Sequence, residues 1–477
     1  MKLRRAAFFH ALTVFVLAAA APAFGQTDSM IPTPSEAASQ SPYQGSVPGE
    51  RVNGVLPLSL QDAIDRGLKQ NLGALLSSED IRSAHGERWK ELSALLPTTS
   101  ATSYVDGSKI DLAEYGFTFN VPGFAFPSIV GPFGYYDARA NVSQSIFDWN
   151  AIEKTHSATE SLKAAQYTYK DARDLVVLAV GYNYLLGIAD EARIETAEAQ
   201  VKSAQAVYDQ ADEQVKAGTS PAIDALRAQV ELKTRMQQLI EARNNFAIQK
   251  LQLARVIGLA PGQEFNLTDK SPYAPFAGMT VEEAEEKAYA SRSDYQAALA
   301  QVRAAEYARK AATAEHFPTL SASADYGLAG STDTLHTNGV FDVRGTLNIP
   351  IFAGGHTHGD VLQAEAQLRQ SRERLDNLRA QIDADVRTAL FNLQSSSEQV
   401  AVARDNIHLA DETLTQSRDR FRAGVTDTVE VVQAEEAVAS AHENYISSLY
   451  NYNYSKISLA RALGLAEQGV KDYFKGH

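Results

Sequence analysis

The chain contains 477 residues, with 44 basic against 58 acidic residues and a formal net charge of -14 at pH 7. This acidic balance argues against a nucleic-acid partner, which would require a basic surface. The chain has no cysteine, which excludes both a disulfide framework and a lipid anchor on an N-terminal cysteine.

The start of the chain has the pattern of a secretory signal peptide. Lys2, Arg4 and Arg5 precede an apolar run at residues 11–21, and Ala23-Phe24-Gly25 offers a cleavage site of the small-x-small type. The alternative, an N-terminal membrane anchor, would need about 20 apolar residues. We therefore predict that the signal covers residues 1–25 and that the mature protein, with a net charge of about -17, leaves the cytoplasm.

Residues 26–56 are expected to form a flexible arm. Pro32, Pro34, Pro42 and Pro48 lie among Ser, Gln and Gly in this stretch, and such a composition cannot bury a core. No later apolar run reaches the length of a membrane-spanning helix, so a membrane crossing would have to use β-strands.

Two long units follow, each predicted to contain a helix, a pair of strands, a long helix and a returning helix. In the first unit, residues 57–264, the helix is expected at 58–96 and the later elements at about 98–147, 149–217 and 221–258. In the second unit, residues 280–465, the helix is expected at 280–317 and the later elements at about 319–351, 356–421 and 427–463. A linker at 265–279 joins the units, and a tail at 466–477 ends the chain. A proline, Pro97 or Pro318, ends the first helix of each unit.

The predicted strands alternate with a period of two. In residues 340–349, for example, Phe341 and Val343 share one face while Asp342 and Arg344 share the other. A length of about ten residues suits a tilted transmembrane strand, although a soluble, half-buried hairpin would alternate in the same way. Residues 121–134, with three Phe and three Pro, are expected to form a long outer loop.

The long helix at 356–421 contains no Pro and only one Gly in 66 residues, so it would be about 100 Å long. Apolar residues recur at every seventh position with small residues between them: Leu393, Val400, Ile407, Leu414 and Phe421 alternate with Ser396, Ala403, Ala410 and Ser417. This pattern predicts a coiled-coil seam in which the small residues let the partner backbone come close.

The same pattern occurs 206 residues earlier, where Ile194, Val201, Tyr208 and Val215 alternate with Ala197, Ala204 and Ala211. At that offset Gly218 corresponds to Gly424, and LARVIGL at 253–259 corresponds to LARALGL at 459–465. We therefore predict that the chain is two copies of one long helical hairpin. Each glycine is expected at the C′ position of its long helix, and Asp427 with Glu430 is expected to form a capping box on the second returning helix.

Four strands cannot close a barrel, and an unclosed edge cannot face lipid, so several chains would have to contribute to one barrel. Two chains would give eight strands and a barrel filled by side chains. Three chains would give twelve strands and a lumen. Strand counting alone does not choose between them.

Taken together, these features resemble the TolC family of bacterial outer-membrane efflux ducts. The resemblance rests on LSLQDA at 58–63, Leu96-Pro97, IFAGG at 351–355, the two turn glycines and LARALG at 459–464, in family order. It implies a mixed α and transmembrane β fold: a homotrimer whose twelve-stranded outer-membrane β-barrel, with four strands per chain, continues into a long periplasmic α-helical coiled-coil barrel. The implied function is the passive outer-membrane exit duct of a tripartite efflux or type I secretion system, docked on a periplasmic adaptor and an inner-membrane pump.

The resemblance also implies roles for residues at the two turns. Contacts with the adaptor are implied for Gly218, Thr219, Ser220, Gly424, Val425 and Thr426, and a periplasmic gate for Asp224 and Glu430. Some members latch the gate with a basic residue at the position of Thr426, so the sequence does not indicate how this mouth would be latched. Alternatively, Asp224 and Glu430 only complement the positive N-terminal dipoles of the returning helices.

No nucleotide-binding loop, glycine fingerprint or nucleophile motif occurs in the sequence, so we expect neither an enzyme nor a cofactor. His356 and His358 lie two positions apart and would not share a helix face, so no metal site is expected there. The sequence leaves open the cargo, which could be a drug, a metal ion or a polypeptide, and the identity of the pump and adaptor. The alternative function is a periplasmic coiled-coil adaptor or scaffold outside the outer membrane, although adaptors usually have one helical hairpin flanked by compact β-domains.

Overall fold

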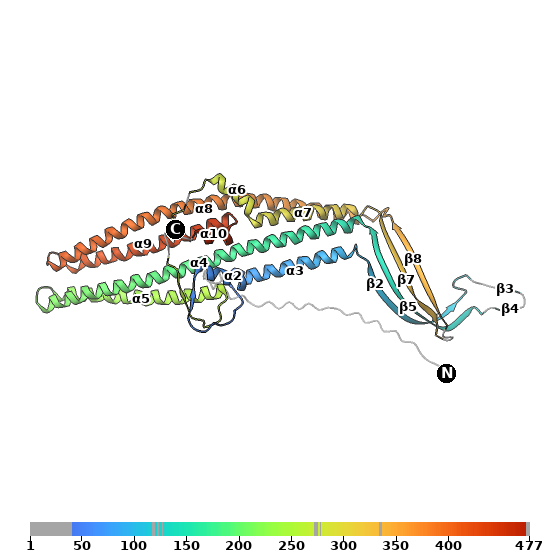
Figure 1. Cartoon of the computed structure of the whole chain (residues 1–477), viewed down its shortest axis with the longest axis horizontal. Helices are drawn as coiled ribbons and strands as arrows, with labels where there is room; N and C mark the ends of the chain where they lie inside the picture. Colours follow the sequence, from blue (N-terminus) through green and yellow to red (C-terminus); the bar gives the residue numbers. More distant parts are fainter. Residues whose placement is uncertain are drawn as a thin grey trace, which may run out of the picture. The chain divides into compact units, whose positions relative to one another are not determined.

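The computed structural model describes residues 41–116, 120–121, 124–125, 127–270, 275–276, 278–332 and 336–473. The expected signal peptide and the arm up to residue 40 lie outside these residues. The unit that begins at Pro42 combines long helices with a four-stranded sheet (Figure 1).

The helices are η1 Pro42–Gln44, α2 Leu60–Gln70, α3 Leu72–Ser93, α4 Trp149–Lys216, α5 Ala222–Ile257, α6 Val281–Ser291, α7 Ser293–Ala314, α8 His356–Arg422, α9 Thr428–Ala462 and α10 Ala466–Tyr473. The strands are β1 Leu56–Leu58, β2 Thr98–Asp111, β3 Asn120–Val121, β4 Phe124–Ala125, β5 Ile129–Phe147, β6 Phe265–Leu267, β7 Thr319–Ser331 and β8 Thr337–Asn348.

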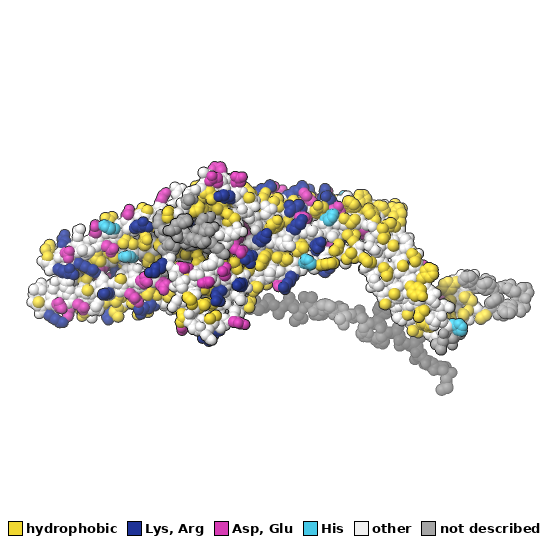
Figure 2. Space-filling model, viewed as in Figure 1, with side chains coloured by type: hydrophobic (Ala, Val, Ile, Leu, Met, Phe, Trp, Pro, Cys, Tyr) yellow, Lys and Arg dark blue, Asp and Glu magenta, His cyan; other side chains and the backbone are white. Residues whose placement is uncertain are grey.

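The four-stranded antiparallel sheet has the order β2-β5-β7-β8. Its register places Ala140 beside Tyr326 and Tyr326 beside Phe341, so the apolar positions of three neighbouring strands share one face. On that face Tyr326 is 67% exposed, and Phe341 and Val343 are each 75% exposed. Figure 2 shows hydrophobic side chains gathered over these strands. A continuous apolar surface of this kind is what lipid-facing strands require.

The opposite face of the sheet is polar. The guanidinium of Arg139 on β5 lies 2.7 Å from a carboxylate oxygen of Asp137 and 2.9 Å from one of Asp325 on β7. The predicted alternation is therefore present across strands as well as along them.

The first helix of each unit is broken, although the sequence predicts continuous helices. Asn71 separates α2 from α3 with an extended backbone, and its Oδ1 accepts a hydrogen bond from the Gly73 N–H at 2.9 Å. The Asn71 amide also donates to the carbonyl of Tyr43 at 2.7 Å. Arg292 breaks the second helix between α6 and α7. The prediction of one helix at 58–96 is wrong because this buried asparagine satisfies its polar groups by starting a new helix.

The described part of the N-terminal arm is held in place, which corrects the expectation of flexibility for residues 42–56. β1 pairs in parallel with β6, a strand inside the predicted linker. The N–H of Val47 donates to the Gln70 carbonyl at 2.9 Å, and that of Gly49 donates to the Gly258 carbonyl at 2.8 Å. Composition does not reveal such an attachment, because backbone hydrogen bonds need no apolar side chains.

Two further boundaries differ from expectation. β5 begins at Ile129, inside the expected outer loop at 121–134, because Ile129, Val130 and Phe133 pair with the end of β2. Residues 466–473 of the expected tail form α10, which is tied to α4 by an ion pair of 2.6 Å between Arg173 and Glu467.

One described helix, α4, contains a stretch long and apolar enough by length and composition to cross a membrane, whereas we expect no such run from the sequence. Within the structure, 61% of that stretch is buried, as in the core helix of a soluble protein.

The long helices carry the predicted seam. α8 packs on α9, and α4 packs on α5, on α7 and on α9. In α8 the apolar seam residues Leu393, Val400, Leu414 and Phe421 are at most 9% exposed. In α4 the small seam residues Ala197, Ala204 and Ala211 are buried, whereas Ile194, Val201 and Val215 are half-buried. Because α4 has 68 residues, about 100 Å of helix separates the sheet from the turn at its end.

Candidate functional site at the hairpin turns

The two turns between long and returning helices have the same backbone geometry. Gly218 and Gly424 have φ angles of 73° and 69°. In the first turn the N–H of Gly218 donates to the Val215 carbonyl at 3.0 Å, and that of Thr219 donates to the Gln214 carbonyl at 2.9 Å. The second turn repeats both bonds around Gly424. This pairing is the Schellman motif, so both glycines occupy the C′ position that the sequence predicts.

The six residues expected to contact an adaptor surround these turns. Four of them are exposed: Gly218, Thr219, Gly424 and Val425. The other two, Ser220 and Thr426, are half-buried and donate hydrogen bonds to the side chains of Gln214 and Glu430 respectively. These six residues are uncharged, whereas the exposed Lys216 and Arg422 lie two positions before the two turn glycines.

Asp224 connects the two turns. It is the third residue of α5 and only 6% exposed. Its Oδ1 accepts a hydrogen bond at 3.0 Å from the hydroxyl of Thr428, the fully buried first residue of α9. Arg227 Nη1 lies 3.7 Å from the same oxygen. The carboxylate thus links the α4–α5 hairpin to the α8–α9 hairpin within one chain.

Glu430 has a different environment. It is the third residue of α9 and half-buried, and its carboxylate accepts a hydrogen bond from Thr426 and lies 3.4 Å from Arg420 Nε. The predicted capping box is wrong, because the Glu430 carboxylate takes Thr426 and Arg420 as partners in place of the Asp427 N–H. Asp427 caps α9 alone, by accepting a hydrogen bond from the Val429 N–H.

The position of both carboxylates also fits the interpretation in which Asp224 and Glu430 only complement the dipoles of the returning helices. A carboxylate in the first turn of a helix is stabilised by the helix dipole by about 0.3–1 kcal/mol. Asp224 and Glu430 both lie in such a turn, so their placement alone agrees with either role.

Sequence reasoning missed a polar network behind the turns. The hydroxyl of Ser203 on α4 donates to the buried Glu435 of α9 at 2.6 Å, and Arg418 of α8 pairs with the same carboxylate at 2.9 Å. On α5, burial raises the pKa of Glu231, although its partner Arg235 at 2.6 Å opposes the shift. Helical periodicity does not distinguish such buried charges from those on a solvated face.

Comparisons with known proteins agree with this architecture. The family model for outer membrane efflux proteins matches residues 131–259 and 285–465. The chain is 25% identical over 357 residues to the outer membrane protein TolC of Escherichia coli, covering 70% of each chain. It is 24% identical over 328 residues to the alkaline protease secretion protein AprF of Pseudomonas aeruginosa, covering 66% of this chain and 67% of that protein. The solved structure of the outer membrane protein VceC of Vibrio cholerae matches with a TM-score of 0.72 at 17% identity, covering 85% of this chain and 96% of that one.

Proposed function

The chain belongs to the outer membrane efflux protein family, and from this membership we propose that three copies of it form a passive exit duct through the outer membrane. The protein resembles the TolC members of the family and is itself an outer-membrane protein. The names of its relatives support transport by efflux or secretion. We expect the duct to act as a channel without a catalytic step.

The observation that carries the proposal is the open sheet. β2 and β8 lie at its two ends, and each pairs on one side only among the described residues. Such edges cannot face lipid unpaired. Two copies would give eight strands and a filled barrel, whereas three copies would give twelve strands and leave a lumen. A duct needs the lumen, so we propose the trimer.

The element order supports an internal duplication. α2, α3, β2, β5, α4 and α5 follow the same order as α6, α7, β7, β8, α8 and α9. Each copy contributes two strands of the sheet and one long helical hairpin. Three chains would thus supply six hairpins to a periplasmic helical barrel that continues the β-barrel. The half-buried residues Ile194, Val201 and Val215 of α4 support this assembly, because neighbouring chains would complete their burial.

We further propose that the two turns dock on a periplasmic adaptor, which couples the duct to an inner-membrane pump. The exposed, uncharged residues Gly218, Thr219, Gly424 and Val425 support this role, because a helical partner could approach their backbone closely. Ser220 and Thr426 would shape the same surface from its edge.

We propose that Glu430 and Asp224 have different tasks at the periplasmic gate. The Asp224 side chain is 9% exposed and bonded to Thr428 within its own chain, so it would hold the two hairpins of one chain together. The Glu430 side chain is 36% exposed, so of the two carboxylates it would contribute more charge to the surface of the mouth. Arg420, which lies beside Glu430, would take the place of a basic latch residue at Thr426.

The names of the relatives cited above, which are outer membrane, secretion and export proteins, favour the duct over the alternative of a periplasmic adaptor or scaffold. The names of two relatives bear on which cargo the duct would carry. Relatives include a protein for alkaline protease secretion and one for pyoverdine export, so both a polypeptide and a small molecule are compatible with the proposal.

The trimer is tested by native mass spectrometry of the untagged protein extracted from outer membranes in detergent. We expect a mass of three mature chains, and the same preparation should form conducting channels in planar bilayers. A stable monomer or dimer, or a trimer without conductance, would contradict the proposal.

A further inference from the structure

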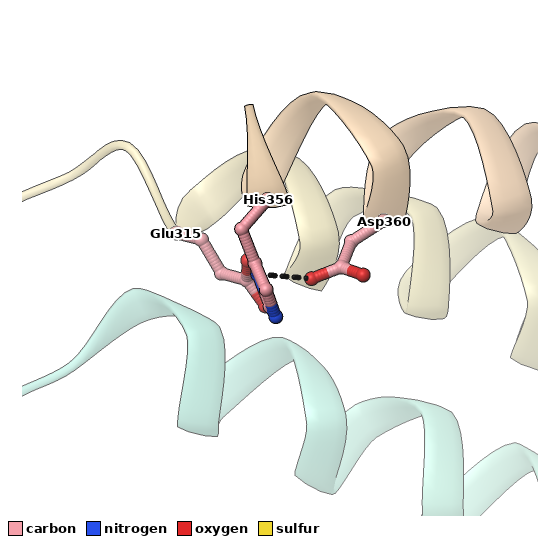
Figure 3. Close-up of side chains that lie close together, drawn as sticks. All are labelled: Glu315, His356 and Asp360. Atoms are coloured by element: carbon pink, nitrogen blue, oxygen red, sulfur yellow. Dashed lines mark ion pairs between the residues drawn. The ribbon is translucent and has the colours of Figure 1, made fainter. Parts of the chain in front are cut away.

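Three side chains with metal-binding chemistry converge where the β7–β8 hairpin joins the helices. Figure 3 shows Glu315, His356 and Asp360 pointing toward one another. Glu315 follows the last residue of α7, and the other two lie in the first turns of α8. One ligand atom from each lies within 4.8 Å of the other two. The proposed transport function uses none of these residues.

The spacing is close to that of a mononuclear site. Ligands bound to a tetrahedral Zn²⁺ lie about 2.0–2.2 Å from the metal, and therefore about 3.3 Å from one another. His356 Nδ1 is already 2.9 Å from Asp360 Oδ2, so this pair needs to open by only a few tenths of an ångström. Glu315 is half-buried, and rotation of its long side chain would close the remaining gap.

Few basic groups lie near the carboxylates of Glu315 and Asp360. Among the described residues, neither Glu315 nor Asp360 has a lysine or arginine at ion-pair distance, and His356 is the one basic partner of Asp360. Asn150 Nδ2 lies 3.5 Å from Glu315 Oε1 and donates to the Ala311 carbonyl at 2.7 Å, so it would orient the glutamate as an outer partner. The His356 side chain is 76% exposed, which gives an ion a path to the cluster.

We propose that Glu315, His356 and Asp360 form a binding site for a divalent transition metal of the zinc class. Imidazole nitrogen and carboxylate oxygen are both ligand types that Zn²⁺ takes, and three protein ligands would leave its fourth position open for water. The site fastens the end of α7 to the start of α8 and so closes the base of the β7–β8 hairpin, whose first pair is Thr319 with Asn348. Metal binding would therefore stabilise the folded chain.

Sequence reasoning considered His356 with His358, which share no helix face. The spacing of His356 and Asp360 could have indicated the pair from the sequence, because residues four positions apart lie on one face of a helix. Glu315 comes from a different element, so only the fold brings it to the pair.

The test is a Zn²⁺ titration by calorimetry on the untagged, chelator-stripped protein in detergent, with Co²⁺ absorption as a spectroscopic check. We expect one saturable site per chain, and loss of affinity by at least about tenfold in His356→Gln and in Glu315→Gln. His358→Gln is the matched control, because it removes an exposed histidine two positions away on the same helix and should bind as the wild type does.

A second readout separates binding from misfolding. Zn²⁺ should raise the melting temperature of the wild type and of His358→Gln, but not that of His356→Gln, which should melt like the metal-free wild type. The proposal is overturned if the wild type shows no saturable binding, or if His358→Gln weakens binding as much as His356→Gln does.

Discussion

At the residue scale, we expect different effects on the channel from substituting the two carboxylates near the turns, Glu430 and Asp224. If Glu430 is the carboxylate that faces the mouth, Glu430→Gln should reduce the cation selectivity of the channel and its block by multivalent cations. Asp224→Asn should change both much less, because that side chain is buried and its replacement can still accept the Thr428 hydrogen bond. Planar-bilayer recordings of the two variants beside the wild type measure this difference.

The helix-dipole interpretation gives a different result for the same pair. It expects each substitution to cost about 0.3–1 kcal/mol of stability and to leave ion selectivity unchanged. If both variants keep the ion selectivity of the wild type, the proposed role of Glu430 in the gate is wrong.

A buried lysine on α9 provides a pH-dependent prediction. Lys456 is 3% exposed, and burial lowers its pKa to about 8, whereas a lysine in the unfolded chain titrates near 10.4. Between these values the unfolded chain binds more protons than the folded chain, so the contribution of Lys456 to stability rises with pH. Lys456→Met removes the titrating group and keeps a long side chain.

We expect Lys456→Met to melt at a higher temperature than the wild type at pH 7, and this difference to shrink as the pH rises above about 8 toward 9.5. Thermal unfolding of both proteins across this range provides the measurement. A difference in melting temperature that stays constant with pH would show that the lysine titrates near its ordinary pKa in the folded protein.

At the element scale, the turn at Gly424 can be altered without disturbing the sheet. Its φ of 69° resists any residue with a Cβ, although a Cβ built there meets no atom within 4 Å. The strain from Gly424→Val should therefore remain in the turn, about 100 Å of helix away from the strands. We expect trimers to form normally and transport to be lost because the docking surface is distorted, as measured by export in cells and by trimer yield.

Gly86→Val is the matched control for that variant. Gly86 lies on the exposed surface of α3, and a Cβ built there also meets no atom within 4 Å, but its backbone does not adopt a positive φ. It should export normally. Normal export by Gly424→Val would show that the turn does not dock on the adaptor.

The elements that the sequence predicts well are those set by a repeating pattern. The buried seam of α8 follows from heptad spacing, and the two turns follow from glycines at C′. What the sequence missed depends on contacts between distant segments. The break at Asn71 needs the Tyr43 carbonyl as its partner, and the buried Glu435 of α9 needs the hydroxyl of Ser203 on α4. No local periodicity contains either contact.

At the scale of the whole molecule, the proposed duct depends on how the sheet closes. Within one chain β2 and β8 are separated by β5 and β7, a distance of about 14 Å at the usual strand spacing. A disulfide joins Cα atoms less than about 7 Å apart, so cysteines on β2 and β8 cannot bond within one chain. If neighbouring chains close the barrel, the same cysteines meet between chains.

Disulfide scanning across these edges tests the central claim most directly, because the natural chain contains no cysteine. Ala101→Cys on β2 is combined in turn with single cysteines along β8, and outer membranes are analysed on non-reducing gels. The proposed barrel predicts that at least one register yields a covalent species of three chains, with dimers as its precursor and no larger product. Monomers in every register, or a cross-linked product that ends at two chains or continues beyond three, would contradict the twelve-stranded duct.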